Sequence, residues 1–468
     1  MAAIIDFLNT IFWGYILIYG LLAVGVYFTL RLGFLQIRFF PEMIRTVFQA
    51  PQSDRGGISP FQALCTSLAS RVGTGNLAGV AVAIALGGPG AIFWMWVVAL
   101  IGMATSYAES TLAQLYKIRD ENGQLRGGPA FYIAKGLKAP WAGAVFSLAL
   151  ILAFGLVFNA VQANSIAGAV EGAFGVNKVV TGVVLTLLAA IVIFGGIKRI
   201  ARISEIVVPV MALLYLVIAF YVIFSNIHDV PAVFALIFKS AFGIEQAAGG
   251  VAGALLNGVK RGLFSNEAGM GSAPNIAAIA TPNPHHPSSQ GLVQALGVFI
   301  DTILICTATA LMILLSGALD SGETGIKLTQ AAMTEHVGDF GNSFVAIAIF
   351  FFAFTSIIGN YSYAENALTF LKLANKPGIF ILRVLALAMI PWGAYESVAM
   401  VFNAADAAMG LMATINLIAI LFLSGLVAKL TRDYFSQRKK GGNPRFDVNN
   451  FPEVKDEIDL SVWDEHKK

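Results

Sequence analysis

The sequence predicts an all-α, polytopic membrane protein with about eleven transmembrane helices, arranged as a 5+5 inverted repeat plus one extra N-terminal helix. Hydrophobic residues make up 57% of the chain and charged residues only 12%, with a mean hydropathy of +0.75. A soluble domain carries about 25% charged residues. A helix needs about 20 apolar residues to cross a bilayer, and apolar stretches of this length recur along the chain. Polar, glycine-rich breaks interrupt two of these stretches.

The expected spans are the long apolar stretches, which polar segments separate. They lie at about 11–31, 60–86, 90–115, 141–170, 178–196, 204–224, 246–280, 290–316, 342–370, 378–400 and 404–430. The shorter apolar stretch at 230–245 is expected to form an interfacial helix. These stretches predict a transmembrane domain at 1–433 and a polar tail at 434–468.

Lysine and arginine gather in alternate loops, and this bias predicts the orientation in the membrane. With the N-terminus outside, 24 of the 30 basic residues, Arg55 in the first loop among them, fall in cytoplasmic loops or in the tail. The acidic stretch between Asp320 and Asp339 then lies outside. The C-terminus is therefore expected in the cytoplasm, and its charge-rich tail is expected to be poorly ordered.

The two breaks lie at 69–76 and 262–274, in the second and seventh apolar stretches. An unwound backbone is tolerated in lipid only where it is buried in protein or lines a cavity. Without the first stretch, two groups of five remain, about 60–224 and 246–430, and each begins with a broken helix. Because five is odd, the groups run in opposite directions, as in the inverted repeats of secondary transporters. The alternative is that these glycines only let helices pack closely.

Each break exposes backbone groups that suit a zwitterion and a cation. Amides around Gly75 and Asn76 favour a carboxylate, because they lie at the positive end of a half-helix. Carbonyls around Ala69 and Val72 favour a cation, and carbonyls near Phe264 favour an ammonium group. The breaks therefore predict an amino-acid site that needs no charged side chain.

A second group of oxygen atoms is expected in the stretch 342–370. Phe352, Thr355 and Ser356 are spaced to lie on one helix face. Two hydroxyl groups and nearby carbonyls form a hard, uncharged oxygen site that suits sodium. The alternative is that both hydroxyl groups only bond back to their own helix.

Six ionisable residues fall in or near the expected spans, where such groups are costly and usually paired or functional. They are Arg71, Glu109, Glu267, Asp301, Glu365 and Asp406. Arg71 is expected to pair with Glu267 or Asp301, to form an inner gate, or to hold its helix against the scaffold. Each of the carboxyl groups is a candidate carrier of a coupled proton.

Nothing in the sequence indicates an enzyme. H-E-x-x-H and G-x-S-x-G motifs are absent from it. Cys65 and Cys306 lie in apolar stretches without metal-ligand spacing, and His285 and His286 are expected to form a polar loop. No cofactor, obligatory protein partner or nucleic acid is implied. A channel or an amino-acid sensor remains an alternative class of function.

Four motifs carry a resemblance to a known family. They are Val72-Gly73-Thr74-Gly75-Asn76, Gly127-Gly128-Pro129-Ala130-Phe131-Tyr132, Arg261-Gly262-Leu263-Phe264-Ser265-Asn266-Glu267-Ala268-Gly269 and Phe299-Ile300-Asp301-Thr302. Over about residues 10–430 the chain resembles the alanine/glycine:cation symporter family of the amino acid–polyamine–organocation superfamily. Membership implies the leucine-transporter fold, and sodium- or proton-driven uptake of alanine or glycine across a bacterial or archaeal plasma membrane.

The resemblance also implies which residues bind the substrate and the ion. The expected substrate-binding residues are Gly73, Thr74, Gly75, Asn76, Gln162, Phe264, Ser265, Asn266, Gly269 and Asn360. The expected sodium ligands are Ala69, Val72, Phe352, Thr355 and Ser356. Many relatives carry a tryptophan after the residue that corresponds to Gly359. Asn360 therefore predicts a pocket that accepts a larger or more polar amino acid, such as serine or glutamine.

Overall fold

The chain is predominantly helical in the computed structural model, which describes residues 2–49, 57–195, 197–243 and 250–463. Arg55, the start of the predicted second repeat (246–249) and the end of the tail (464–468) lie outside the described residues. Within the described residues, the only strands are β1 (Ile118–Arg119) and β2 (Leu125–Arg126), which pair antiparallel. The predicted all-α class is confirmed.

Eight described helical stretches are long and apolar enough to cross a membrane, and one bent pair can supply a ninth span. The predicted total of eleven stays a prediction, because two expected spans are short. Lys178–Ile193 has 16 residues and Gly250–Asn266 has 17, fewer than the about 20 that cross a bilayer. The eight are Ala2–Arg31, Gly90–Leu115, Pro140–Phe174, Arg202–Ser225, Pro287–Leu314, Asp339–Phe370, Lys376–Tyr395 and Val398–Phe422.

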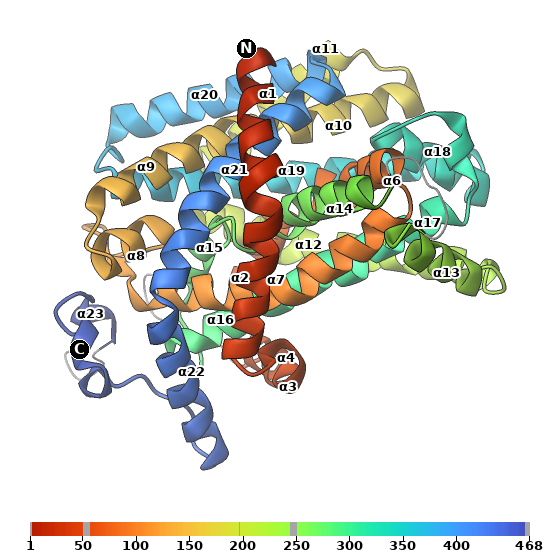
Figure 1. Cartoon of the computed structure of the whole chain (residues 1–468). Helices are drawn as coiled ribbons and strands as arrows, with labels where there is room; N and C mark the ends of the chain where they lie inside the picture. The colour runs from red at the N-terminus through yellow and green to blue at the C-terminus, as the bar shows by residue number, and fades with distance from the viewer. Residues whose placement is uncertain (1, 50–56, 196, 244–249, 464–468) are drawn as a thin grey trace.

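Shorter segments divide several of these spans (Figure 1). In the first half of the chain the segments are α1 (Ala2–Ile11), η1 (Phe12–Ile16), α2 (Leu17–Arg31), α3 (Leu35–Arg38), α4 (Phe40–Val47), α5 (Pro60–Arg71), η2 (Gly75–Gly79), α6 (Val80–Gly87), α7 (Gly90–Leu115), α8 (Pro129–Gly136), α9 (Pro140–Leu150), η3 (Ile151–Val157), α10 (Phe158–Phe174), α11 (Lys178–Ile193), α12 (Ile197–Ser225) and α13 (Val230–Ala241).

The second half continues in the same manner. Its segments are α14 (Gly250–Asn266), α15 (Pro274–Ile279), α16 (Pro287–Val298), η4 (Phe299–Cys306), α17 (Thr307–Leu314), η5 (Ala318–Ser321), α18 (Ile326–Val337), α19 (Asp339–Phe370), α20 (Lys376–Tyr395), α21 (Val398–Phe422), α22 (Ser424–Lys439), η6 (Val448–Asn450), η7 (Pro452–Val454) and α23 (Leu460–Trp463). The segments η1 to η4 are π-helical, a geometry that occurs frequently at functional sites.

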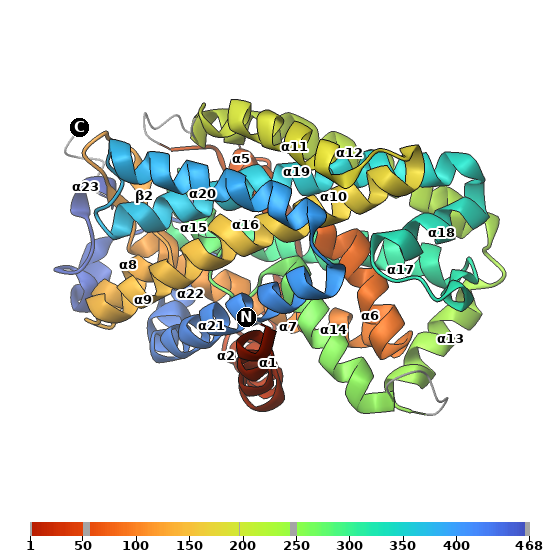
Figure 2. The ribbon, with the colours of Figure 1, turned by 90° about the horizontal axis from the view of Figure 1, so that it is seen from above.

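Two packed groups of helices meet at the broken helices. α7 packs against α14 and α16, while α10 packs against α19 and α20. Figure 2 shows α10, α19 and α20 running side by side, with α6, α7 and α14 beyond them. α5 contacts α19, and η2 contacts α14. The break between α5 and η2 therefore lies where the two groups face each other.

The N-terminal helix lies beside the last span. Figure 1 shows α1 and α2 as one long rod alongside α21. The buried Trp13 anchors it, because its Nε1 donates a hydrogen bond to the backbone oxygen of Asp406 (3.1 Å). The first apolar stretch is thus an addition at the outside of the two packed groups.

The described part of the tail packs against the rest of the protein, so its predicted poor order is wrong for residues 434–463. Apolar residues between its charges, Phe446, Phe451 and Trp463 among them, are buried. Trp463 Nε1 donates to the backbone oxygen of Leu115 at the end of α7 (3.2 Å). The high charge of the tail as a whole gives no indication of these apolar residues. Their burial stabilises the packing of the tail against the rest of the protein.

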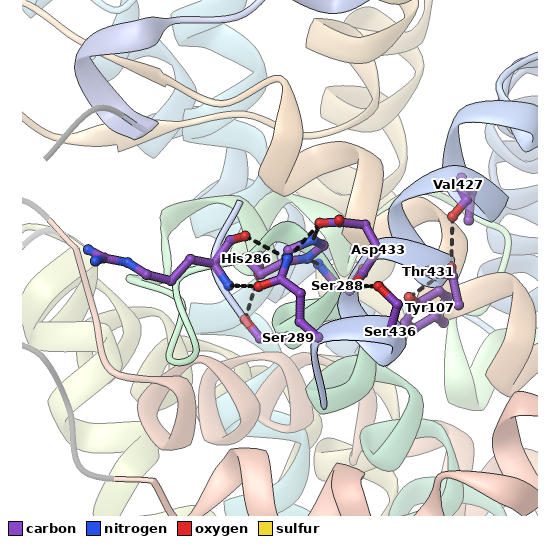
Figure 3. Close-up of polar contacts among 10 residues, drawn as sticks. Tyr107, His286, Ser288, Ser289, Val427, Thr431, Asp433 and Ser436 are labelled. Atoms are coloured by element: carbon purple, nitrogen blue, oxygen red, sulfur yellow. Dashed lines mark hydrogen bonds and ion pairs between the residues drawn. The ribbon is translucent and has the colours of Figure 1, made fainter. Parts of the chain in front are cut away.

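His286 joins α16 to α22 (Figure 3). Its Nδ1 accepts a hydrogen bond from Ser288 N (3.1 Å), so Nε2 carries the proton and donates to Asp433 Oδ2 (3.2 Å). Burial lowers the pKa of His286 and favours this neutral form. The expected loop is present, but His286 is buried in it and caps α16. The predicted loop is therefore confirmed, and the structure adds that His286 is buried within it.

Candidate functional site

The first broken helix bends between α5 and η2. Its axis turns by 53° across the break. Val72 ends α5 with extended backbone angles (φ −76°, ψ 93°). Gly73 allows close packing at the break, because a Cβ there would lie 2.3 Å from Ser356 Oγ and 2.8 Å from Gln162 Oε1. A side chain at position 73 would push this break away from α19 and α10.

The second broken helix unwinds between α14 and α15. Glu267, Gly269 and Gly271 have positive φ angles of 58°, 90° and 84°, a region that glycine adopts without strain. Glu109 on α7 stabilises this stretch. Its carboxylate accepts hydrogen bonds from Gly269 N (3.1 Å) and from Asn416 Nδ2 (2.7 Å). The described structure therefore contains interruptions at both places where the sequence predicts them.

The two breaks touch each other. A Cβ at Gly75 would lie 3.1 Å from both Phe264 Cδ1 and Ser265 Cα. Asn76 Nδ2 donates a hydrogen bond to Ser265 Oγ (3.2 Å). The Phe264 ring stacks on Phe158, with 5.0 Å between ring centroids. Residues from the two predicted repeats thus share one buried region.

The five expected sodium ligands come together between α5 and α19. Ser356 Oγ lies 2.9 Å from the carbonyl oxygen of Ala69, 3.1 Å from that of Phe352 and 3.5 Å from that of Val72. Thr355 Oγ1 donates to the Phe352 oxygen (2.9 Å). Both hydroxyl groups therefore bond back to their own helix, and Ser356 also reaches the first break. This arrangement holds a set of uncharged oxygen atoms of the kind that sodium prefers.

Several expected substrate-binding residues meet at the first break. Gln162 Oε1 accepts a hydrogen bond from Thr74 N (3.0 Å), and Asn76 Oδ1 accepts one from Gly73 N (2.9 Å). Thr74 Oγ1 and Asn266 Nδ2 are buried without a hydrogen-bond partner among the described residues. Buried polar groups usually have a hydrogen-bond partner, and a bound ligand could supply the partner that these two atoms lack.

Two other expected substrate-binding residues are bonded to other partners. Asn360 Nδ2 donates to Asn159 Oδ1 (3.2 Å), and Asn360 Oδ1 lies 2.7 Å from Ser70 Oγ on α5. Gly269 contacts Glu109 and Asn416. The side-chain hydrogen bonds of the described residues do not join Asn360 or Gly269 to Thr74 or Gln162.

Asp301 in η4 belongs to the site, although it is missing from the expected site residues. Its carboxylate accepts hydrogen bonds from Asn76 Nδ2, Ser265 Oγ and Thr302 Oγ1, each at 2.7 Å. The side chain is fully buried and links the first break to the second. The signal that marks it in the sequence is an acidic residue inside an apolar stretch.

Arg71 does not pair with a carboxylate in the way the sequence suggested. Within the described residues, no ion pair joins it to Glu267 or Asp301. Its guanidinium group donates instead to the backbone oxygen of Gln294 (3.2 Å) and to Gln294 Oε1 (3.1 Å). Arg71 therefore ties α5 to α16, which agrees with the structural alternative.

Among solved structures, manganese transporters resemble this fold. A manganese transporter of Eremococcus coleocola has a TM-score of 0.53 and 14% sequence identity. The similarity covers 91% of this chain and 85% of that transporter. At this identity the likeness shows the fold alone, which is that of a polytopic membrane protein.

Sequence relatives identify the family. The model of the sodium:alanine symporter family matches residues 1–448. The amino-acid carrier protein AlsT of Bacillus subtilis is 50% identical over 100% of this chain and 98% of its own length. The probable sodium/glutamine symporter GlnT of that species is 52% identical over 95% of this chain and 92% of its own length. The sodium/alanine symporter AgcS of Methanococcus maripaludis is 42% identical over 93% of this chain and 98% of its own length. The chain belongs to the sodium:alanine symporter family, whose members are transporters and not enzymes.

Proposed function

We propose that this protein takes up a small neutral amino acid, alanine or glycine, together with sodium, by alternating access across a bacterial or archaeal plasma membrane. The contact between Ser356 and the first break carries the proposal, because it joins the expected ion site to the expected substrate site. The family assignment and the relatives named for sodium and alanine support it. The arginine and lysine bias supports an outside N-terminus and a cytoplasmic C-terminus.

The backbone of the first break supplies most of the binding groups. The half-helix that begins at η2 directs amides at a substrate carboxylate, and Thr74 Oγ1 adds an unpaired hydroxyl group. Carbonyl oxygens of Ala69 and Val72, with the Thr355 and Ser356 hydroxyl groups, coordinate sodium. Because Val72 lies next to Gly73, binding of the ion stabilises the backbone geometry that binds the amino acid.

Uptake into proteoliposomes tests this function. Radiolabelled alanine should accumulate under an inward sodium gradient, and Ser356→Ala should weaken the apparent sodium affinity about tenfold, because one oxygen ligand is lost. Ser362→Ala is the matched control, since its hydroxyl group bonds to the Gly359 oxygen of the same helix (2.6 Å). Uptake driven only by a proton gradient would assign the coupling to a buried carboxyl group instead.

A second candidate substrate is a larger neutral amino acid, such as serine or glutamine, coupled to sodium or protons. Asn360 favours it, because its side chain is smaller and more polar than the tryptophan of many relatives and is bonded to Asn159 on α10. The relative GlnT is named for glutamine. We expect glutamine and serine to compete with alanine at least tenfold less effectively in Asn360→Trp than in the wild type. Competition by alanine and glycine alone in the wild type would contradict this candidate.

A further inference from the structure

A small cavity opens between the end of α2 and α22. Its volume is about 220 Å³, and it is lined by Arg31, Leu32, Ala428, Thr431 and Arg432. Both arginines are exposed, and they come from opposite ends of the sequence. The cavity lies away from the two breaks and plays no part in the proposed transport site.

The two guanidinium groups in this cavity have no acidic partner within the described residues. Arg31 lies over the Tyr27 ring, 5.7 Å from its centroid, and Arg432 Nε donates to the Ala428 backbone oxygen (3.3 Å). Two other basic residues of α22 are paired with acidic residues. Lys429 Nζ lies 2.6 Å from Glu453 Oε1, and Arg438 Nη2 lies 2.7 Å from Glu42 Oε1. The cavity therefore brings together two guanidinium groups that no acidic side chain of the described residues compensates, whereas Lys429 and Arg438 on the same helix are compensated.

The surroundings of Arg31 are those of a membrane interface. Arg31 is the last residue of the 30-residue apolar helix Ala2–Arg31. Large apolar side chains next to it in sequence are exposed, with Leu30 at 61%, Phe34 at 48% and Ile37 at 71%. Exposed apolar groups beside two neighbouring arginines suit a molecule with acyl chains and an anionic headgroup. The guanidinium fork matches the oxygens of a phosphate group.

We propose that Arg31 and Arg432 bind the phosphate group of an anionic membrane phospholipid at the cytoplasmic face. The lipid bridges α2 and α22, which lie beside the packed groups that carry the breaks. Basic pockets between helices at this face favour anionic headgroups by attraction to the phosphate. Free inorganic phosphate shares the headgroup chemistry but makes no use of Leu30, Phe34 and Ile37.

Native mass spectrometry of the purified, full-length protein tests the site. After removal of native lipid, the protein is titrated with phosphatidylglycerol, phosphatidylcholine or inorganic phosphate. We expect phosphatidylglycerol to bind in preference to phosphatidylcholine, and Arg31→Gln and Arg432→Gln each to weaken its binding about fivefold. Lys439→Gln, which removes an exposed positive charge from the end of α22, should leave binding unchanged.

The double variants decide the outcome. Arg31→Lys with Arg432→Lys keeps both charges and should retain part of the affinity, whereas the double glutamine variant should lose the preference for phosphatidylglycerol. An unchanged melting temperature in lipid-free detergent establishes that the variants are folded. Equal binding of phosphatidylglycerol by the wild type and the double glutamine variant would overturn the site. Saturable binding of inorganic phosphate without a preference for phosphatidylglycerol would overturn its assignment to lipid.

Discussion

Asp301→Ala is expected to reduce sodium-driven amino-acid uptake at least about a hundredfold, measured as Vmax/KM in proteoliposomes. The substitution removes the carboxylate that accepts hydrogen bonds from Asn76, Ser265 and Thr302 in a fully buried region, and it leaves the Ser265 and Thr302 hydroxyl groups without this acceptor, whereas Asn76 Nδ2 keeps the backbone oxygen of residue 301 (3.1 Å). Each unpaired buried donor costs about 1–3 kcal/mol, and about 1.4 kcal/mol corresponds to a tenfold change. Because Asn76 and Ser265 belong to different breaks, the loss falls on the geometry that joins them.

Asp301→Asn separates a positioning role from a role of the charge. An amide oxygen still accepts from Asn76 Nδ2, and the amide nitrogen donates to the Ser265 hydroxyl group, which is free to rotate. If Asp301 acts through these hydrogen bonds, Asp301→Asn should retain uptake within about tenfold of the wild type and raise KM more than it lowers Vmax. Asp339→Asn, at an exposed acidic residue of α19, is the control for expression and insertion.

The opposite result would assign Asp301 to the ion. If Asp301→Asn were as inactive as Asp301→Ala while both proteins were folded, the negative charge itself would be required. The sodium dependence and pH dependence of the residual uptake would then distinguish contact with sodium from carriage of a proton. The positioning role would be wrong in either case.

The sequence predicts the helices well because their signal is local. Gly90–Leu115 has the predicted bounds, since the length of an apolar run and its flanking residues are visible in the chain itself. Both breaks are also predicted correctly, because glycine and polar residues that gather inside an apolar run favour an unwound backbone buried in protein. The count of eleven goes beyond what helix length supports, since α11 and α14 are shorter than a typical span.

Contacts between distant segments account for most of what the sequence does not predict. The bond between Asn76 and Asp301 joins residues 225 positions apart, and no local pattern marks it. The partner of Arg71 is an uncharged glutamine, so a search for opposite charges misses it. The order of the tail is mispredicted for a related reason. A few apolar residues such as Trp463 are buried against α7, and this burial stabilises the tail despite the many charges around them.

Asp406→Ala is expected to destabilise the folded protein by about 3–5 kcal/mol, measured by denaturant unfolding in detergent micelles. Asp406 on α21 forms an ion pair with Arg261 on α14, and both side chains are at most 5% exposed. The substitution leaves the guanidinium group buried against the rings of Phe264 and Phe402 without a counter-charge. The exposed pair of Glu171 and Lys178 is the control, because Glu171→Ala should cost no more than about 1 kcal/mol.

A double variant distinguishes an uncompensated charge from a lost contact. Asp406→Leu with Arg261→Met removes both charges and should recover most of the stability, since apolar groups of similar size replace buried ion pairs at little cost. Recovery should stay incomplete, because Lys260 Nζ lies 3.8 Å from Asp406 Oδ2 and also loses a partner. If the double variant were as unstable as Asp406→Ala, packing at α21 rather than charge would explain the loss. Recovered stability without recovered uptake would indicate that Arg261 also holds the Phe264 ring at the second break.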